Sequence, residues 1–197
     1  YKYMNNNIIT IAREFGSGGR ELGRKLAERL GYDFIDKEVI YEIMKETEFS
    51  EEYVRKTLRG AQKVPYLGDM LFYQPRLEVL NAQRDTVLKL AERGGCVIVG
   101  RCADFILKDA GRDPYRIFVY ADMDYRMSRC RRKNKLDPQL TDKDMKKVIQ
   151  KIDKMRADYF EQFSFMKWGS RENYELSINT TGQSIDEMAD RLAAFLK

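Results

Sequence analysis

The chain has 197 residues, with 36 Lys and Arg against 31 Asp and Glu, a net charge of +5, and no histidine. Its length fits a single domain with its own core, and its 43% hydrophobic content excludes a disordered chain. We expect neither a membrane span nor a signal peptide, because no apolar run approaches the ~20 residues that cross a bilayer. The lack of histidine excludes Ser-His-Asp triads, Cys-His pairs and His-ligated zinc.

The three cysteines, Cys96, Cys102 and Cys130, are odd in number and form no C-x-x-C motif. A disulfide framework is therefore not expected, and we predict buried thiols and a cytoplasmic location.

The basic excess is concentrated between Arg112 and Arg156, where fourteen Lys and Arg face seven Asp and Glu, a local net charge of +7. Focused positive charge attracts anions, which include nucleic acid, a membrane surface or a phosphorylated small molecule. The alternative is a solvated basic face.

Short apolar runs alternate with helical patterns along the chain. The expected strands are 8–12, 32–36, 96–99, 117–120 and 175–179. The expected helices include 22–30, 39–44, 77–91, 145–155 and 185–196. The stretch 60–75 is less regular and predicts a loop or a broken helix, either packed down or covering a ligand. The alternation predicts an α/β three-layer sandwich with a five-stranded parallel sheet, which binds ligands beyond the carboxyl ends of its strands.

A glycine-rich turn, Gly16-Ser17-Gly18-Gly19, joins the first strand to the first helix. Glycine lets the backbone curl tightly and approach a ligand, and the following helix directs unpaired N–H groups at the turn. This context predicts a phosphate site. The alternative is a turn that only closes a βα unit.

The turn departs from the standard phosphate-binding loop G-x-x-x-x-G-K-[ST]. With Gly19 as the second glycine, Arg20 and Glu21 take the lysine and Ser/Thr positions. With Gly18 as the second glycine, Arg13 takes the first position, and Gly19 and Arg20 take the lysine and Ser/Thr positions. Both registers lack the lysine, so Arg13 or Arg20 is expected to supply its charge. The predicted nucleotide-binding residues are Arg13, Gly16, Ser17, Gly18, Gly19, Arg20 and Glu21, with Ser17 and Glu21 also as Mg²⁺ ligands.

At this point the chain resembles the cytidylate kinase-like family, relatives of the nucleoside monophosphate kinases. The resemblance is carried, in order, by ITIAREFGSGGRELG (9–23), FIDK (34–37), VGR (99–101), 118–132, DKMRADYF (153–160) and 168–180. It implies a P-loop kinase fold that uses ATP and Mg²⁺ to phosphorylate a small-molecule acceptor. It also implies one domain over 1–197, in which 36–93 is the helical acceptor-binding region and about 131–141 is a mobile helical lid.

Phosphoryl transfer needs alignment and positive charge more than covalent chemistry, which suits this arginine-rich chain. The residues expected to act in catalysis are Arg20, Arg126, Arg129 and Arg156. Those expected to hold the acceptor are Asp36, Arg101, Arg126, Asp153 and Tyr159. Most of them have a simpler alternative. These are a surface arginine for Arg101, a solvated basic helix for Arg126 and Arg129, an intrahelical pair for Asp153 and Arg156, a helix N-cap for Asp36 and core packing for Tyr159.

The function that these features favour is a kinase that moves the γ-phosphoryl group of ATP to a nucleoside monophosphate (CMP-like) or a related acceptor. The missing lysine keeps a second hypothesis open, a catalytically silent nucleotide-binding sensor or scaffold. A nucleic-acid binder is disfavoured, because no recognition motif is present and the glycine turn would be unexplained.

Overall fold

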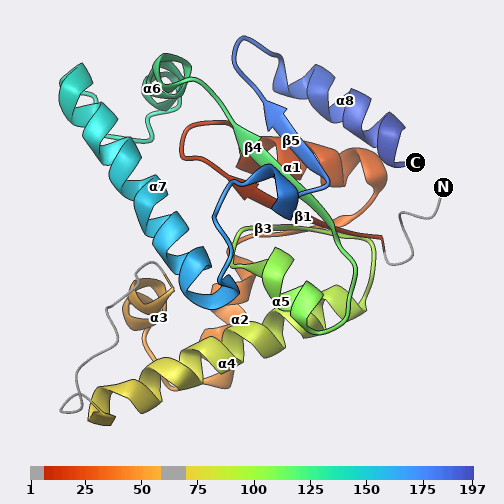
Figure 1. Ribbon diagram of the computed structural model, residues 1–197, viewed down its shortest axis with the longest axis vertical. Coiled ribbons are helices and arrows are strands. Elements are labelled where there is room, and N and C mark those ends of the chain that lie inside the picture. The colour runs from red at the N-terminus through yellow and green to blue at the C-terminus, as the bar shows by residue number, and fades with distance from the viewer. Residues whose placement is uncertain (1–6, 59–69) are drawn as a thin grey trace.

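The computed structural model describes residues 7–58 and 70–197, with the side chains of the second range described from Pro75 onward. A single parallel sheet forms its centre, with the strand order β2-β3-β1-β4-β5 (Figure 1). The strands are β1 (Ile8–Arg13), β2 (Asp33–Ile35), β3 (Cys96–Val99), β4 (Tyr115–Tyr120) and β5 (Leu176–Asn179). The predicted five-stranded parallel sheet is confirmed.

Helices cover both faces of the sheet (Figure 1). The described helices are α1 (Gly19–Leu30), α2 (Glu38–Glu46), α3 (Glu51–Thr57), α4 (Met70–Glu92), α5 (Ala103–Asp109), α6 (Met123–Arg132), α7 (Asp142–Ser164) and α8 (Ile185–Leu196), with a short 3₁₀ turn η2 (Arg171–Asn173). Helices α1 and α8 pack on one face through Leu22, Leu26 and Leu192. The opposite face packs against α2, α4, α5 and the end of α7. The three-layer α/β prediction is therefore confirmed.

The period-2 alternation of β1 divides its side chains between the two cores: Ile9 and Ile11 enter the core under α1, while Ile8 enters the opposite core. Strands buried on both faces read as continuous apolar runs, which explains the sequence pattern. The register aligns Ile11 with Val99 and Arg13 with Val119, so the central strands end together. The loops that follow β1 and β3 thus meet at one edge of the sheet.

Two helices differ from the sequence expectations. Helix α4 begins at Met70, ahead of the expected 77, and contains Pro75 within its first two turns. Of the irregular stretch 60–75, residues 60–69 lie outside the described residues, while 70–75 are helical rather than a loop. The seven-residue α5 was not predicted. Across the described residues, none of the helices combines the length and apolar character needed to traverse a bilayer.

Candidate functional site: a glycine turn beside an arginine-lined pocket

The turn between β1 and α1 depends on two glycines with left-handed backbone, Gly16 with φ 83° and Gly18 with φ 93°. Gly18 is the N-cap of α1, and no side chain caps that helix. A Cβ atom on Gly16 would lie 3.0 Å from the carbonyl oxygen of Arg126, and one on Gly18 would lie 3.1 Å from Nε of Arg129. Helix α6 therefore packs directly against the turn, and larger residues are excluded at both positions.

Three side chains from distant elements and one from the turn itself, that of Ser17, hold main-chain carbonyls of this turn. The donors and acceptors are Arg156 Nη1 to Arg13 O (2.9 Å), Arg126 Nε to Phe15 O (2.8 Å), Ser17 Oγ to Glu14 O (2.9 Å) and Thr180 Oγ1 to Ser17 O (2.6 Å). With its carbonyls fixed by side chains, the turn has one defined shape.

Several main-chain N–H groups of the same turn, unlike its carbonyls, have no protein partner within the described residues. Within the described residues, the N–H groups of Gly16, Gly18 and Arg20 donate to no protein atom. Unpartnered amides at the start of a helix, together with the helix dipole, make a concave anion site. The turn therefore presents free hydrogen-bond donors of the kind that can bind an anion.

Arg126 and Arg129 are almost fully buried, each with 4% exposure. Arg126 forms an ion pair with Asp153 and a second with Glu14 at 3.1 Å. Arg129 pairs with Glu21 at 2.5 Å, while its Nε has no partner within the described residues and faces Gly18. These two arginines thus support the turn from behind, which differs from the solvated basic helix considered as an alternative.

Arg20 leaves the turn in another direction. Its Nε donates to Oδ2 of Asp36 at 2.5 Å, and its guanidinium lies 5.9 Å from the ring centre of Phe34. Asp36 is 7% exposed and is not the N-cap of α2, since Lys37 occupies that place. The pair joins the start of α1 to the end of β2.

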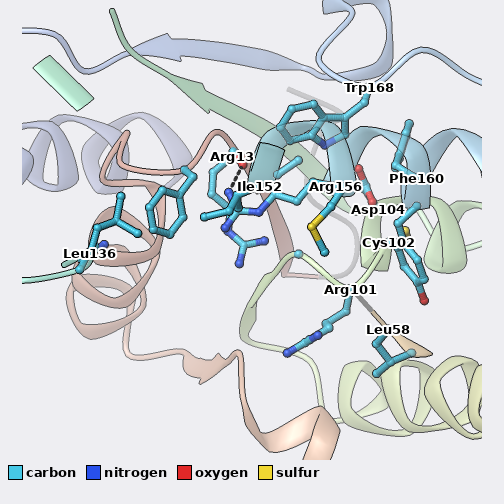
Figure 2. Close-up of a pocket in the computed structure, with 16 residues that line it drawn as sticks. Arg13, Leu58, Arg101, Cys102, Asp104, Leu136, Ile152, Arg156, Phe160 and Trp168 are labelled. Atoms are coloured by element: carbon cyan, nitrogen blue, oxygen red, sulfur yellow. Dashed lines mark hydrogen bonds between the residues drawn. The ribbon is translucent and has the colours of Figure 1, made fainter. Parts of the chain in front are cut away.

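A pocket of about 560 Å³ lies beside the turn (Figure 2). Its cationic lining residues are Arg13, Arg101, Lys135 and Arg156, and its single carboxylate among the described residues is Asp104. Phe160 and Trp168 form an apolar wall (Figure 2). Positive charge beside an apolar wall suits an anionic ligand with a hydrophobic body.

Arg13 belongs to both the turn and the pocket. Burial and the nearby cations Arg156 and Arg101 lower the pKa of Arg13 to about 9. Within the described part of the chain, no hydrogen bond or ion pair holds its guanidinium. A partly buried cation that its surroundings do not neutralise favours an incoming anion.

The loop after β3 has an unusual backbone. Gly100, Arg101 and Cys102 adopt left-handed φ angles of 75°, 63° and 51° in succession. Gln83 Nε2 donates to the carbonyl of Arg101 at 2.9 Å, and the hydroxyl of Tyr159 donates to Oε1 of Gln83 at 2.8 Å. Non-glycine residues in this region of φ are strained and concentrate at functional sites. The chain from Tyr159 to Arg101 holds this strained turn at the pocket.

Burial raises the pKa of Asp104 to about 6. Asp104 lies in the first turn of α5 and is 7% exposed. Its carboxyl group therefore gains or loses a proton near neutral pH within the pocket.

The predicted magnesium ligands are already engaged. Ser17 is fully buried, and its hydroxyl donates to the carbonyl of Glu14, while Glu21 pairs with Arg129. The described residues contain no group of three or more acidic or thiol side chains that fits a metal ion. Both side chains are thus held by protein partners in this arrangement, and the assignment of Ser17 and Glu21 as Mg²⁺ ligands stays a prediction.

The structure brings most predicted site residues to one edge of the sheet. Arg13, Arg101, Arg156 and Tyr159 line the pocket, whereas Arg126, Arg129 and Asp153 lie behind the turn. The predicted lid segment 131–141 comprises the end of α6 and the connection to α7, and it contributes Lys135 and Leu136 to the pocket. Its closing motion stays a prediction.

Sequence reasoning missed Asp104 and Gln83, placed Lys135 only within the lid segment, and gave Gly100 no role of its own. Asp104 had a usable signal, because it follows the third strand by only five positions and so lies near its carboxyl end. Gln83 had none, since a glutamine within a long helix is ordinarily solvent-facing.

Comparisons with protein families, with known sequences and with solved structures all find similar proteins. The model of the cytidylate kinase-like family matches residues 8–182. Shikimate kinase from Alkaliphilus oremlandii is 27% identical over 166 residues, which are 83% of this chain and 89% of that protein. A crystal structure of an uncharacterized protein from Eubacterium ventriosum has a TM-score of 0.71 and 27% identity, over 96% of this chain and 97% of that one. The shikimate kinase from Acinetobacter baumannii in complex with shikimate has a TM-score of 0.56 and 18% identity, over 98% and 93% of the two chains, and it shows the likeness of fold.

Proposed function

The chain belongs to the cytidylate kinase-like family, and we propose that it is a kinase that transfers the γ-phosphoryl group of ATP to a small anionic acceptor such as a nucleoside monophosphate. The observation that carries this proposal is the position of Arg13. This residue ends β1 at the glycine turn and also lines the arginine-rich pocket. A donor in the turn and an acceptor in the pocket would therefore meet at its guanidinium.

The geometry supports binding of the donor phosphates by the turn. The amides of Gly16, Gly18 and Arg20 supply hydrogen bonds without any rearrangement of the protein, because none of them has a partner in the described structure. The buried Nε of Arg129 adds a further donor beside Gly18. Fixed donors of this kind stabilise charge without reorganisation during the reaction.

The proposed reaction moves one phosphoryl group. A hydroxyl oxygen of the acceptor forms a bond to the γ-phosphorus, the bond to the β,γ-bridging oxygen breaks, and its electron pair stays on ADP. In this proposal the proton of the hydroxyl passes to the carboxylate of Asp36, whose charge acts on both Arg13 and Arg156. Arg13 and Arg156 stabilise the charge on the equatorial oxygens. Mg²⁺ bound to ATP neutralises phosphate charge in such reactions, and no step here depends on a protein ligand to it.

The pocket favours an acceptor with an acidic group and a ring. Its four cationic lining residues face one carboxylate, so an anion is attracted, and Phe160 and Trp168 give an apolar wall. CMP combines a phosphate with a flat base. Shikimate, named for two similar kinases, combines a carboxylate with hydroxyl groups. Both belong in the acceptor panel.

The test is ADP release measured with ATP and a panel that contains the four nucleoside monophosphates and shikimate. We expect turnover with at least one acceptor, and a loss of ~100-fold or more in kcat/KM for Arg156→Ala. Arg24→Ala, an exposed arginine paired only with Glu28 in the described structure, is the matched control and should keep full activity. Absence of ADP release with every acceptor would contradict the proposal.

A silent nucleotide-binding protein is the second candidate. The favouring observation is that the lysine position of the loop holds Gly19 or Arg20, and Arg20 is turned toward Asp36. ATP calorimetry combined with the ADP assay separates the two functions, because the silent protein binds ATP and releases no ADP with any acceptor.

A further inference from the structure

Two departures from the standard phosphate-binding loop lie in direct contact with each other. Gly18 is the left-handed N-cap of α1, and we take it as the second glycine of the loop because it directly precedes the helix. In this register the first glycine is replaced by Arg13, the last residue of β1, and the lysine is replaced by Gly19, the first residue of α1. The loop has thus lost a glycine at one end and a lysine at the other.

The space at Gly19 is filled by Arg13. A Cβ atom on Gly19 would lie 2.6 Å from Cβ of Arg13, 3.1 Å from its Cγ and 3.1 Å from Cβ of Val119. The first of these distances is shorter than any van der Waals contact between carbon atoms. No residue larger than glycine fits at the lysine position while Arg13 keeps its place, since the obstructing atoms belong to the stem of the arginine near the backbone.

The same arginine continues to a second glycine. A Cβ atom on Gly100 would lie 2.0 Å from Nη1 of Arg13 and 3.1 Å from its Cζ. The arginine side chain therefore runs from the turn after β1 to the turn after β3, with Gly19 beside its stem and Gly100 against its guanidinium. Its charged end lies among Arg101 and Arg156 at the pocket.

We infer that Arg13 replaces the missing lysine from the opposite end of the loop, and that its guanidinium contacts the phosphoryl group that is being transferred. The inference rests on the proposed function, because it assumes that ATP phosphates occupy the turn. The positive charge of the standard loop is retained, but it is carried by the residue at the end of β1, and Gly19 provides the room for it. A guanidinium offers two parallel N–H groups to one phosphoryl group, whereas an ammonium acts as a point charge.

The replacement of the lysine by Arg13, called the exchange below, is tested by a double-mutant cycle of Arg13→Gly and Gly19→Lys. The two substitutions together restore the standard G-x-x-x-x-G-K sequence. Arg13→Gly should lower ATP affinity and turnover by ~10-fold or more, because the charge is lost. Gly19→Lys should lower them too, because its side chain meets Arg13. The double variant should recover to within roughly threefold of the wild type, so the two effects are strongly non-additive.

Three control variants separate the steric effect at Gly19 from the charge effect at Arg13 and from unspecific effects of substitution. Gly19→Ala adds only the Cβ atom and should show the steric loss without a new charge. Arg13→Lys keeps a charge at the end of β1 and should keep more affinity than Arg13→Gly. Arg112→Gly removes an exposed loop arginine outside the site and should leave ATP binding unchanged. The folded fraction of each variant is checked by urea denaturation.

The readouts distinguish failure of this inference from failure of the proposed function. ATP affinity, measured by calorimetry, tests the exchange even where no acceptor is turned over. Strictly additive losses in the cycle would overturn the inference that Arg13 replaces the lysine, and so would an Arg13→Gly variant with wild-type ATP affinity and turnover. In either case, ADP release by the wild type would still support the proposed kinase activity. A wild type that binds no ATP would overturn both.

Discussion

Asp153 accepts a hydrogen bond from the main-chain N–H of Phe15 at 2.7 Å, although 138 positions separate the two residues in the sequence. The other carboxylate oxygen of Asp153 pairs with Arg126, and Arg126 in turn donates to the carbonyl of Phe15 at 2.8 Å. The main-chain N–H and the main-chain carbonyl of Phe15 are thus both bound by side chains, one from α7 and one from α6. The shape of the glycine turn therefore depends on how these two helices pack.

Asp153→Asn should destabilise the protein by about 3 kcal/mol, because it removes one partner of a largely buried ion pair and leaves the Arg126 charge with Glu14 alone. Urea denaturation measures the loss. Asp158→Asn is the matched control, since Asp158 forms an exposed i,i+4 pair with Lys154 and should cost less than about 1 kcal/mol. Equal effects of the two substitutions would contradict the clamping role.

Gly100→Ala should impair ATP turnover, because its Cβ atom would displace the guanidinium of Arg13. Gly111→Ala is the control: its φ of 72° is close to the 75° of Gly100, and nothing lies within 4 Å of a Cβ there. Both variants should lose about 1 kcal/mol from the left-handed backbone, as measured by denaturation. Only Gly100→Ala should lower turnover, by ~10-fold or more, and equal activity of the two would refute the contact.

Tyr159→Phe should weaken acceptor binding while leaving ATP affinity unchanged. The hydroxyl of Tyr159 holds Gln83, which holds the strained carbonyl of Arg101 at the pocket. We expect a KM for the acceptor raised severalfold and a stability loss of about 1 kcal/mol. Tyr41→Phe, at an exposed position of α2, is the control for loss of a phenol group. A change in ATP affinity without one in acceptor KM would contradict this assignment.

Stability should depend on pH through Asp104. Burial raises its pKa from 3.8 to about 6, so the native state binds the proton more tightly than the unfolded state. The free energy of unfolding therefore falls as pH rises from about 4 to about 6 and changes no further above that range. The loss amounts to roughly 3 kcal/mol at most, since one pKa unit corresponds to about 1.4 kcal/mol.

Asp104→Asn cannot ionise, which isolates this effect from other carboxylates. Denaturation curves of the variant and the wild type between pH 4 and 8 should diverge in favour of the variant as pH rises to about 6. A constant difference over this range would show that Asp104 titrates at an ordinary pKa.

The sequence was sufficient to predict the sheet. The central strands are apolar runs bounded by turn residues, as in Cys96–Val99 with Gly95 before it and Gly100 after it. The beginnings of α7 and α8 were also predictable, because Thr141 and Ser184 accept hydrogen bonds from the amides of Asp144 and Glu187 as N-caps do. These features are local, and sequence patterns report local preferences.

Helix α4 was predicted to begin too late because Pro75 is unfavourable within a helix. In the structure α4 packs along α2 and α5, with Val79 and Val87 buried in the shared core. This packing outweighs the intrinsic cost of proline. The seven-residue α5 was missed because it is shorter than the window over which helical periodicity can be read.

The positions of the candidate site residues could be predicted from the sequence, but their contacts could not. Glycine spacing located the turn, and strand ends located Arg13 and Arg101. The partners of Arg126, Arg129 and Asp153 are set by tertiary packing between α6, α7 and the turn, which no local pattern encodes. The contact between Arg13 and Gly19 likewise spans the width of the loop and is visible only in three dimensions.

The most direct test of the account is an NMR titration of the uniformly ¹⁵N-labelled protein with ATP. We expect saturable shifts of the amide signals of Gly16, Gly18 and Arg20, whose N–H groups have no partner within the described residues, with smaller changes at Gly111 on a distant loop. ATP that binds without moving these three signals, or that leaves the whole spectrum unchanged at saturating concentration, would contradict the claim that the glycine turn receives the phosphates.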